Sequence, residues 1–393
     1  MDDPLLHAIA GRFGTPTYVY DLDLITRRRG ELERFLPRAA LRYAVKANPN
    51  GAVLRHLAAL GAGAEVITLG ELERALRAGV EPPDILVGGP RQDAELVARS
   101  SEAGVGLASL DSADQWRTWR DHAGDVRMLV RVNPGLDPRT HEHLATGAAT
   151  SKFGLSPAAA LELGREVADA GLLAGFHVHA GSMIRDLAVY DAILDVLAPL
   201  YDALPGRPLV DLGGGFAVPD FPLEAFARRA QRLAAQLGAR LLLEPGRFLV
   251  AESGVLLTRV LHLKRDGPTR HVVADAGMAE LLRPALYGAV HPIRVVSTGA
   301  AAPVASGPED TLDIDGPLCE NADRLGRERR LPAVAAGTLL AVAEAGAYGF
   351  AMASNYASSP RPAEVAVEAG VARLVRRRES VADLWRLEIE PPP

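Results

Sequence analysis

One lysine at the end of an apolar segment is the first candidate for chemistry. Lys46 lies in the run 41–47, whose residues predict a buried strand. A lysine is rarely buried unless something compensates its charge, and a desolvated, neutral amine reacts with carbonyl groups to form a Schiff base. The alternative is structural, because a lysine at a strand end can also extend its amine into solvent.

Two glycine-containing turns offer sites for a phosphate and for a charged ring. Three consecutive glycines at 213–215 expose backbone N–H groups without side chains, which suits a phosphate. The alternative is a tight turn that needs positive φ angles. Glu244 and Arg247 place an acid and a base on either side of a Pro-Gly turn. A cofactor with a protonated ring nitrogen and a phosphate could use both, whereas the structural alternative is an ion pair across the turn.

These residues follow apolar runs that alternate with amphipathic segments. Strand-helix alternation predicts parallel strands joined by helical crossovers, and eight such units predict a closed (β/α)₈ barrel of the α/β class. The carboxyl ends of barrel strands meet on one face, so residues far apart in sequence would share one site there. The predicted strands are 41–47, 64–68, 84–88, 106–110, 127–132, 174–179, 209–212 and 241–243, and the clearest helical segments are 52–60, 72–78, 157–170 and 223–237.

After about residue 255 the pattern changes to strands with few helices between them. Predicted strands lie at 255–262, 271–274, 293–297, 339–344 and 364–368. We therefore predict a barrel domain over residues 30–255 and a mostly β domain formed by residues 1–29 together with 256–393, because chain termini often pack together.

Composition and charge exclude several classes of protein. The 393 residues exceed the usual size of one core. The net charge of −6 is unclustered, which argues against nucleic-acid binding. The single cysteine, Cys319, excludes an intramolecular disulfide and fits a reducing compartment. The N-terminus lacks a signal-peptide pattern, and no apolar stretch approaches the roughly 20 residues of a membrane span. We expect a soluble cytoplasmic protein without a metal site.

A series of short motifs runs in order through most of the chain. The set resembles the fold-type III pyridoxal-phosphate-dependent decarboxylases, which act on diaminopimelate, ornithine and related amino acids. The Arg-Pro-Ala-Leu-Tyr and Cys-Glu elements look closest to the diaminopimelate decarboxylase branch. The motifs occupy residues 43–49, 181–182, 211–216, 244–247, 275–278, 283–287, 316–320, 346–348, 354–356 and 361–364.

This resemblance implies pyridoxal 5'-phosphate as the cofactor and assigns roles around its ring. Lys46 would bind it through a Schiff base, His179 would stack on the ring, and Glu244 would pair with the protonated ring nitrogen. The positive pyridinium is an electron sink, and a nearby carboxylate favours its charged form. His177 shares the strand face of His179 and is predicted to fill the barrel. The residues expected around the phosphate and the rest of the cofactor are Ser182, Gly213, Gly214, Gly215, Gly246, Arg247 and Tyr348.

The resemblance also implies a homodimer with shared active sites. Cys319 would reprotonate the substrate carbon in the neighbouring subunit's site, and Glu320 would bind the far amino group. Arg283 would give a second substrate carboxylate a bidentate partner. The structural alternatives are a small apolar role for the cysteine and a salt bridge from Arg283 to the 275–277 loop. The expected substrate-binding set is Arg247, Arg283, Tyr287, Glu320 and Tyr348.

The expected reaction converts meso-diaminopimelate to L-lysine and CO₂, with three alternatives left open. The segments 89–91, 179–183 and 319–323 depart from the common diaminopimelate pattern, so the substrate could be a related or conjugated amino acid of a siderophore or antibiotic pathway. A racemase would need a base on each face of the substrate carbon. A non-catalytic homologue is possible because fold does not fix function, but intact Lys46, Glu244 and Cys319 argue against it.

Overall fold

The chain divides into two compact units. The computed structural model describes residues 1–135, 151–265, 269–297 and 310–389. One unit comprises residues 26–249, and the other comprises residues 1–25 and 250–393. In the described part of the chain, no helix is both long and apolar enough to cross a membrane.

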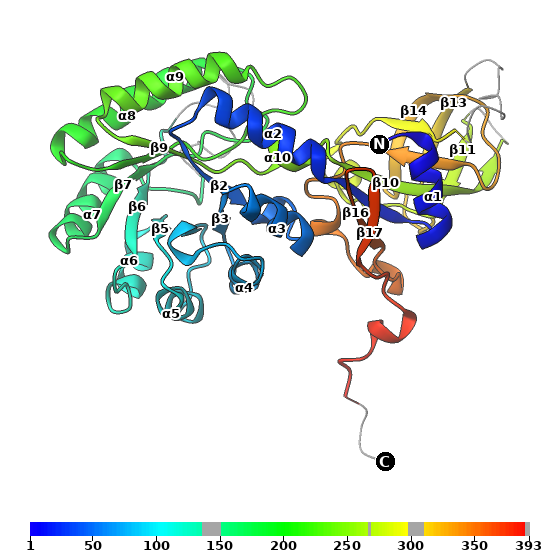
Figure 1. Ribbon diagram of the computed structural model, residues 1–393, viewed down its shortest axis with the longest axis horizontal. Helices are drawn as coiled ribbons and strands as arrows, with labels where there is room; N and C mark the ends of the chain where they lie inside the picture. The colour runs from blue at the N-terminus through cyan, green and yellow to red at the C-terminus, as the bar shows by residue number, and fades with distance from the viewer. Residues whose placement is uncertain (136–150, 266–268, 298–309, 390–393) are drawn as a thin grey trace. The chain divides into compact units, whose positions relative to one another are not determined.

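The first unit is a closed barrel of eight parallel strands (Figure 1), as predicted. The strands follow the chain in order around the barrel, and β2 pairs with β9 to close it, with Ala40 opposite Leu242. Each strand is short and mostly buried, as expected where helices cover the outer face of a parallel sheet. The strands are β2 (Ala40–Ala44), β3 (Gly63–Val66), β4 (Ile85–Val87), β5 (Leu107–Leu110), β6 (Arg127–Arg131), β7 (Leu173–His177), β8 (Leu209–Asp211) and β9 (Arg240–Leu243).

Helices connect the strands and begin at the capping residues that the sequence supplies. The side chains of Thr68, Asp93 and Ser112 each accept a hydrogen bond from a backbone N–H in the first turn of the following helix, which satisfies an otherwise unpaired donor. The helices are α2 (Leu22–Phe35), α3 (Gly51–Ala59), α4 (Leu69–Arg77), α5 (Ala94–Ala103), α6 (Ala113–Arg120), α7 (Pro157–Asp169), α8 (Ala188–Ala203) and α9 (Leu223–Gln236).

Apolar side chains from successive strands pack together inside the barrel. Six strands each contribute one buried residue to a single cluster, so the barrel interior is a packed core. Its members are Leu86, Leu107, Leu129, Ala174, Leu209 and Leu242.

The second unit is built around a mixed sheet. Its central strand β10 pairs with β1, β11 and β15. Strand β1 also pairs in parallel with β16, so the N-terminal segment joins this sheet. The strands are β1 (Thr17–Asp21), β10 (Gly254–Lys264), β11 (His271–Ala274), β12 (Ile293–Val295), β13 (Asp310–Asp315), β14 (Arg324–Leu331), β15 (Leu339–Val342), β16 (Ala363–Glu368) and β17 (Val371–Arg376), with helices α1 (Asp3–Phe13) and α11 (Arg283–Tyr287). The short helix α10 (Arg247–Val250) ends the barrel unit.

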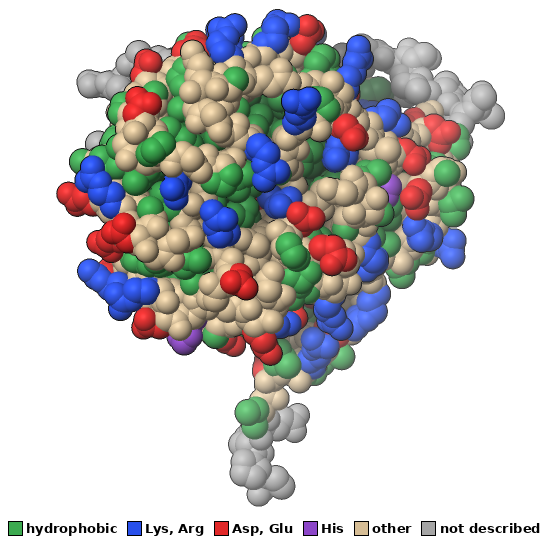
Figure 2. Space-filling view, turned by 60° about the vertical axis from the view of Figure 1, so that its left-hand side comes forward, with side chains coloured by type: hydrophobic (Ala, Val, Ile, Leu, Met, Phe, Trp, Pro, Cys, Tyr) green, Lys and Arg blue, Asp and Glu red, His purple; other side chains and the backbone are tan. Residues whose placement is uncertain are grey.

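Acidic and basic side chains are interspersed over the face drawn in Figure 2. This mixture agrees with the mild net charge of −6.

Candidate active site

Lys46 faces a buried carboxylate at the carboxyl end of the barrel. Strand β2 ends at Ala44, where its pairing with β3 also ends, so Lys46 lies in the following 3-10 turn (Val45–Ala47) and not in the strand itself. Its Nζ lies 2.7 Å from Oε2 of Glu65. The Glu65 side chain is 3% exposed and the Lys46 side chain 37% exposed. The charge is therefore compensated while the amine stays accessible to a small molecule.

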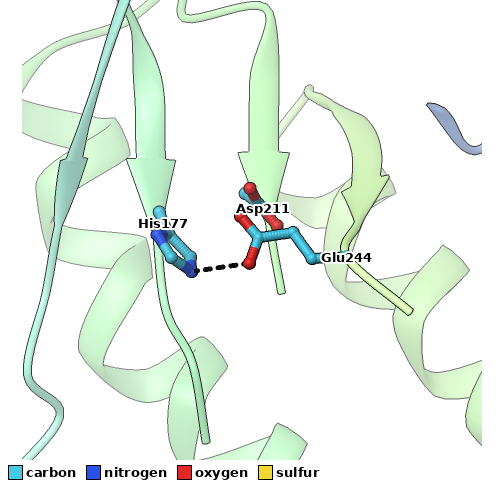
Figure 3. A group of neighbouring side chains, drawn as sticks. All are labelled: His177, Asp211 and Glu244. Carbon is cyan, nitrogen blue, oxygen red and sulfur yellow. Dashed lines mark ion pairs between the residues drawn. The ribbon is translucent and has the colours of Figure 1, made fainter. Parts of the chain in front are cut away.

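Three buried polar side chains converge beside this pair. His177, Asp211 and Glu244 come from the ends of β7, β8 and β9, and each offers a polar atom within 4.8 Å of the others. Figure 3 shows His177 and Glu244 pointing toward each other, with His177 Nε2 3.9 Å from Glu244 Oε2. Among the described residues, His177 Nε2, Asp211 Oδ2 and Glu244 Oε1 have no hydrogen-bond partner. Unsatisfied buried polar atoms are costly, so this cluster is suited to receive a polar ligand.

Burial sets the protonation states of this cluster. It raises the pKa of Glu244 well above its usual range, and repulsion from Asp211 and Glu65 adds to the rise. Burial also raises the pKa of Asp211, although the hydrogen bond from the Gly213 N–H to that carboxylate acts to lower it. Burial lowers the pKa of His177 well below its usual range, so the imidazole is neutral at pH 7. A cationic ligand beside Glu244 would favour the ionised carboxylate.

The three glycines allow close backbone approaches next to this cluster. Gly213 and Gly215 have φ angles of +64° and +85°, which other residues adopt only with strain. A Cβ on Gly215 would collide with the carbonyl of Gly181, and a Cβ on Gly214 would collide with that of Glu244. The Gly214 N–H donates to Nδ1 of His179 at 3.5 Å. The loop is thus a side-chain-free surface beside His179 and Glu244.

The other predicted barrel residues lie around the same loop. Ile184 forms a bridge with Phe216, which brings the Gly181–Ser182 segment beside the three glycines, and Ser182 is exposed. A Cβ on Gly246 would lie 3.0 Å from the Cβ of Ala44, so the Glu244–Arg247 turn packs closely on the Lys46 turn. Arg247 begins the short helix α10. The structure therefore brings the predicted barrel residues together at the carboxyl ends of the strands.

The remaining predicted residues belong to the β unit. Arg283 begins helix α11, and its guanidinium lies 6.0 Å from the centre of the Tyr348 ring, a cation–π distance. Tyr287, at the end of the same helix, is 64% exposed. Cys319 and Glu320 are also exposed, and the Tyr356 hydroxyl donates to the Glu320 carboxylate.

Asp323 fixes the turn that carries Cys319 and Glu320. Its carboxylate accepts from the backbone N–H groups of Leu318 at 2.6 Å and Met278 at 2.5 Å, and the residue is 2% exposed. A Cβ on Gly277 or Gly316 would collide with this carboxylate. Asp323 therefore ties the 316–320 turn to the 275–278 loop.

We expect Asp323→Ala to lower the free energy of unfolding by about 2–4 kcal/mol, because two partly buried N–H groups lose their charged acceptor. It should also change the rate at which a thiol reagent labels Cys319. Urea denaturation and labelling kinetics measure the two effects. Asp323→Asn keeps one acceptor oxygen, so its stability and labelling rate should lie between those of the wild type and Asp323→Ala. Wild-type stability and labelling in Asp323→Ala would contradict this role.

Several residues of this site were not predicted from the sequence. Glu65 pairs with Lys46, and Ser109 binds His177. Arg131 forms an ion pair with Asp111 at 3.1 Å and contributes to the lowered pKa values of His177 and His179. A usable signal existed for Glu65 and Ser109, since both are polar residues inside otherwise apolar runs.

The family of the chain follows from comparison with known proteins. A family model described as "Pyridoxal-dependent decarboxylase, pyridoxal binding domain" matches residues 22–251. The chain belongs to the pyridoxal-dependent decarboxylases. Its barrel residues fit pyridoxal 5'-phosphate, because they provide an accessible amine, a buried carboxylate oxygen without a partner, and a glycine loop that a Cβ would fill.

Relatives of this pyridoxal-dependent decarboxylase match along nearly its whole length. Diaminopimelate decarboxylase of Deinococcus radiodurans is 40% identical, with 98% of each chain covered. The protein of the same name from Zymomonas mobilis is 37% identical, covering 99% of this chain and 96% of its own. The crystal structure of diaminopimelate decarboxylase from Helicobacter pylori complexed with L-lysine superposes with a TM-score of 0.89 at 32% identity, covering 98% and 99%.

Proposed function

We propose that this decarboxylase converts meso-diaminopimelate to L-lysine and CO₂. The observation that carries the cofactor chemistry is the cluster at the barrel's carboxyl end, where Lys46 and Glu244 lie beside the glycine loop. The substrate is supported by full-length relatives named diaminopimelate decarboxylase and by a relative whose structure is described as complexed with L-lysine, the product.

The barrel residues divide the work of holding the cofactor. Lys46 provides the amine that binds it covalently, and the Glu65 carboxylate keeps that amine in place. The Glu244 carboxylate would pair with the protonated ring nitrogen, and His179 would pack on the ring. Ser182, the glycine loop and Arg247 would bind the phosphate. When bound, the cofactor supplies an electron sink for the electrons left by the departing carboxyl group.

The β-unit residues act on the substrate. Cys319 delivers a proton to the carbon that loses CO₂, and Glu320, held by the Tyr356 hydroxyl, binds the distal amino group. Arg283, with Tyr287 beside it, binds the distal carboxylate, because a guanidinium offers two parallel N–H groups to it. Ornithine lacks this second carboxylate, so Arg283 distinguishes the two substrate classes.

We expect Arg283→Ala to raise the KM for meso-diaminopimelate roughly 10- to 100-fold, because the substrate loses a charge-assisted hydrogen bond. Arg283 is half-buried, so the melting temperature should change little. Arg283→Lys should restore only part of the affinity, since an ammonium lacks the bidentate geometry. Arg373→Ala, which removes an exposed arginine of the same unit, is the matched control. A change in stability without a change in KM would assign Arg283 a structural role.

A homodimer with shared sites is part of this proposal. Cys319 and Glu320 are exposed, and so are the neighbouring apolar side chains of Leu286 and Tyr287, at 53% and 64%. Large exposed apolar groups favour burial against a partner. The cytoplasmic location stays a prediction.

A substrate panel tests the assignment. Values of kcat/KM for meso-diaminopimelate, L-ornithine, L-lysine and larger conjugated amino acids should favour meso-diaminopimelate by at least about 100-fold, because the others leave Arg283 or Glu320 unpaired. A preference for a conjugated amino acid would instead support a specialised pathway, the second candidate, which the substitutions at 179–183 and 319–323 favour.

A further inference from the structure

His177 is a buried histidine with a polar neighbour on each side of its ring. It ends strand β7 and is 4% exposed. Its Nδ1 lies 2.7 Å from Oγ of Ser109 on β5. The backbone of Ser109 is itself held, because its carbonyl accepts from Nε2 of Gln92 at 2.7 Å. The imidazole is therefore held in one orientation by a neighbouring region of the barrel.

The other ring nitrogen is aimed at Glu244. Nε2 lies 3.9 Å from the Glu244 carboxylate and has no hydrogen-bond partner among the described residues (Figure 3). This separation is too long for a hydrogen bond, but a small side-chain rotation would close it. A histidine that only filled volume would not require two polar neighbours on opposite sides of its ring.

The surroundings of Glu244 disfavour its charged form, so a hydrogen-bond donor there would stabilise the carboxylate. Burial disfavours the charged form of Glu244 most, repulsion from Asp211 and Glu65 adds to this, and Lys46 opposes it. A neutral Glu244 would keep the proton that the cofactor's ring nitrogen needs. A hydrogen bond to the charged carboxylate favours ionisation. A donor at Glu244 therefore favours the state in which the ring nitrogen, and not Glu244, carries the proton.

We propose that His177 is a positioning residue for Glu244: the Ser109 hydroxyl donates to Nδ1, which leaves the imidazole proton on Nε2 to donate to the Glu244 carboxylate. The bound carboxylate then presents its other oxygen to the ring nitrogen. This inference rests on the proposed role of Glu244 in holding the cofactor, and it replaces the expectation that His177 only fills the barrel.

Two variants distinguish the effect of the hydrogen-bond donor at His177 from the effect of the volume of its ring. His177→Asn keeps a polar atom near Ser109 but does not reach Glu244, whereas His177→Gln places an amide N–H near the position of Nε2. Each variant and the wild type are loaded with pyridoxal 5'-phosphate labelled with ¹⁵N in the ring. The ¹⁵N chemical shift reports ring protonation from pH 6 to pH 9, and titration of the cofactor-free protein gives its dissociation constant.

The wild type should keep the ring nitrogen protonated across this range. His177→Asn should shift the signal toward the unprotonated position and weaken cofactor binding roughly 10- to 100-fold, the value of a hydrogen bond to a charged group. His177→Gln should recover most of both. Ser109→Ala frees the imidazole without touching Glu244 and should give a smaller change in the same direction, which keeps the test available if His177→Asn does not fold.

Wild-type ¹⁵N shifts and affinity in His177→Asn and Ser109→Ala would overturn the inference and leave the proposed function intact. An unprotonated ring nitrogen in the wild type, or a signal that Glu244→Gln leaves unchanged, would overturn the role of Glu244, and the inference would fall with it. The two failures are therefore distinguished by the wild type and Glu244→Gln alone.

Discussion

Lys46→Ala is expected to lower kcat for meso-diaminopimelate by at least about 1,000-fold, because it removes the amine that binds the cofactor covalently. The purified variant should also lack the visible absorption band of lysine-bound cofactor. Borohydride treatment should leave it without the stable cofactor adduct that the wild type acquires. Absorption spectra and mass spectrometry of the intact chain measure both effects.

Lys46→Arg is the matched control for folding. In Lys46→Ala the buried carboxylate of Glu65 loses the cation 2.7 Å away, and an unpaired buried charge destabilises the fold. Arginine keeps the positive charge beside Glu65 but forms no Schiff base. We expect Lys46→Arg to fold like the wild type and to be as inactive as Lys46→Ala. Turnover within tenfold of the wild type in either variant would remove Lys46 from the mechanism.

Cys319→Ala is expected to lower kcat by about 10²- to 10⁴-fold, the range for loss of a positioned proton donor. The cofactor should stay bound, since Lys46 and Glu244 are untouched. Stability should change by less than about 0.5 kcal/mol, because Cys319 is exposed. Single-turnover kinetics, with the cofactor spectrum recorded in parallel, separate loss of chemistry from loss of cofactor.

Cys319→Ser is the conservative comparison for this prediction. Its hydroxyl is nearly isosteric but a much weaker acid than a thiol, so partial activity between those of the wild type and Cys319→Ala is expected. Unchanged kcat in Cys319→Ala would show that another group supplies the proton. Loss of bound cofactor in that variant would point to a structural role.

The barrel could be predicted from the sequence because its strands are buried on both faces. Such strands are continuous apolar runs, and all eight were placed within three residues of their observed ends, as in β5 (Leu107–Leu110) and β9 (Arg240–Leu243). Because the carboxyl ends of barrel strands converge, the sequence also predicts that Lys46, the glycine loop and Glu244 lie on one face.

The β unit was predicted less completely, for a physical reason. Strand β14 (Arg324–Leu331) contains four arginines in the sequence Arg-Leu-Gly-Arg-Glu-Arg-Arg-Leu, and most of its side chains are only partly buried or exposed. Backbone pairing with β13 holds it in the sheet. A strand stabilised mainly by pairing and not by an apolar face gives no periodic signal.

The side-chain contacts within the site could not be predicted from the sequence, because they join residues on strands that are far apart along the chain. Ser109 and His177 are separated by 68 positions, and the side chains of Asp211 and Glu244 meet only because β8 and β9 are neighbours in the closed barrel. The sequence predicts that His177 and His179 share one face of a strand, but β7 ends at His177, so His179 lies beyond the strand. The sequence could not predict that the His177 ring would face Glu244.

The central claim is tested most directly by supplying cofactor-loaded protein with meso-diaminopimelate and measuring the CO₂ and the lysine that it releases. The account predicts rapid turnover with one CO₂ and one L-lysine for each substrate consumed, and no reaction without pyridoxal 5'-phosphate. No CO₂ release from a protein that shows the band of lysine-bound cofactor would contradict the assigned substrate. Absence of that band would contradict the role of Lys46 and the account of the site built on it.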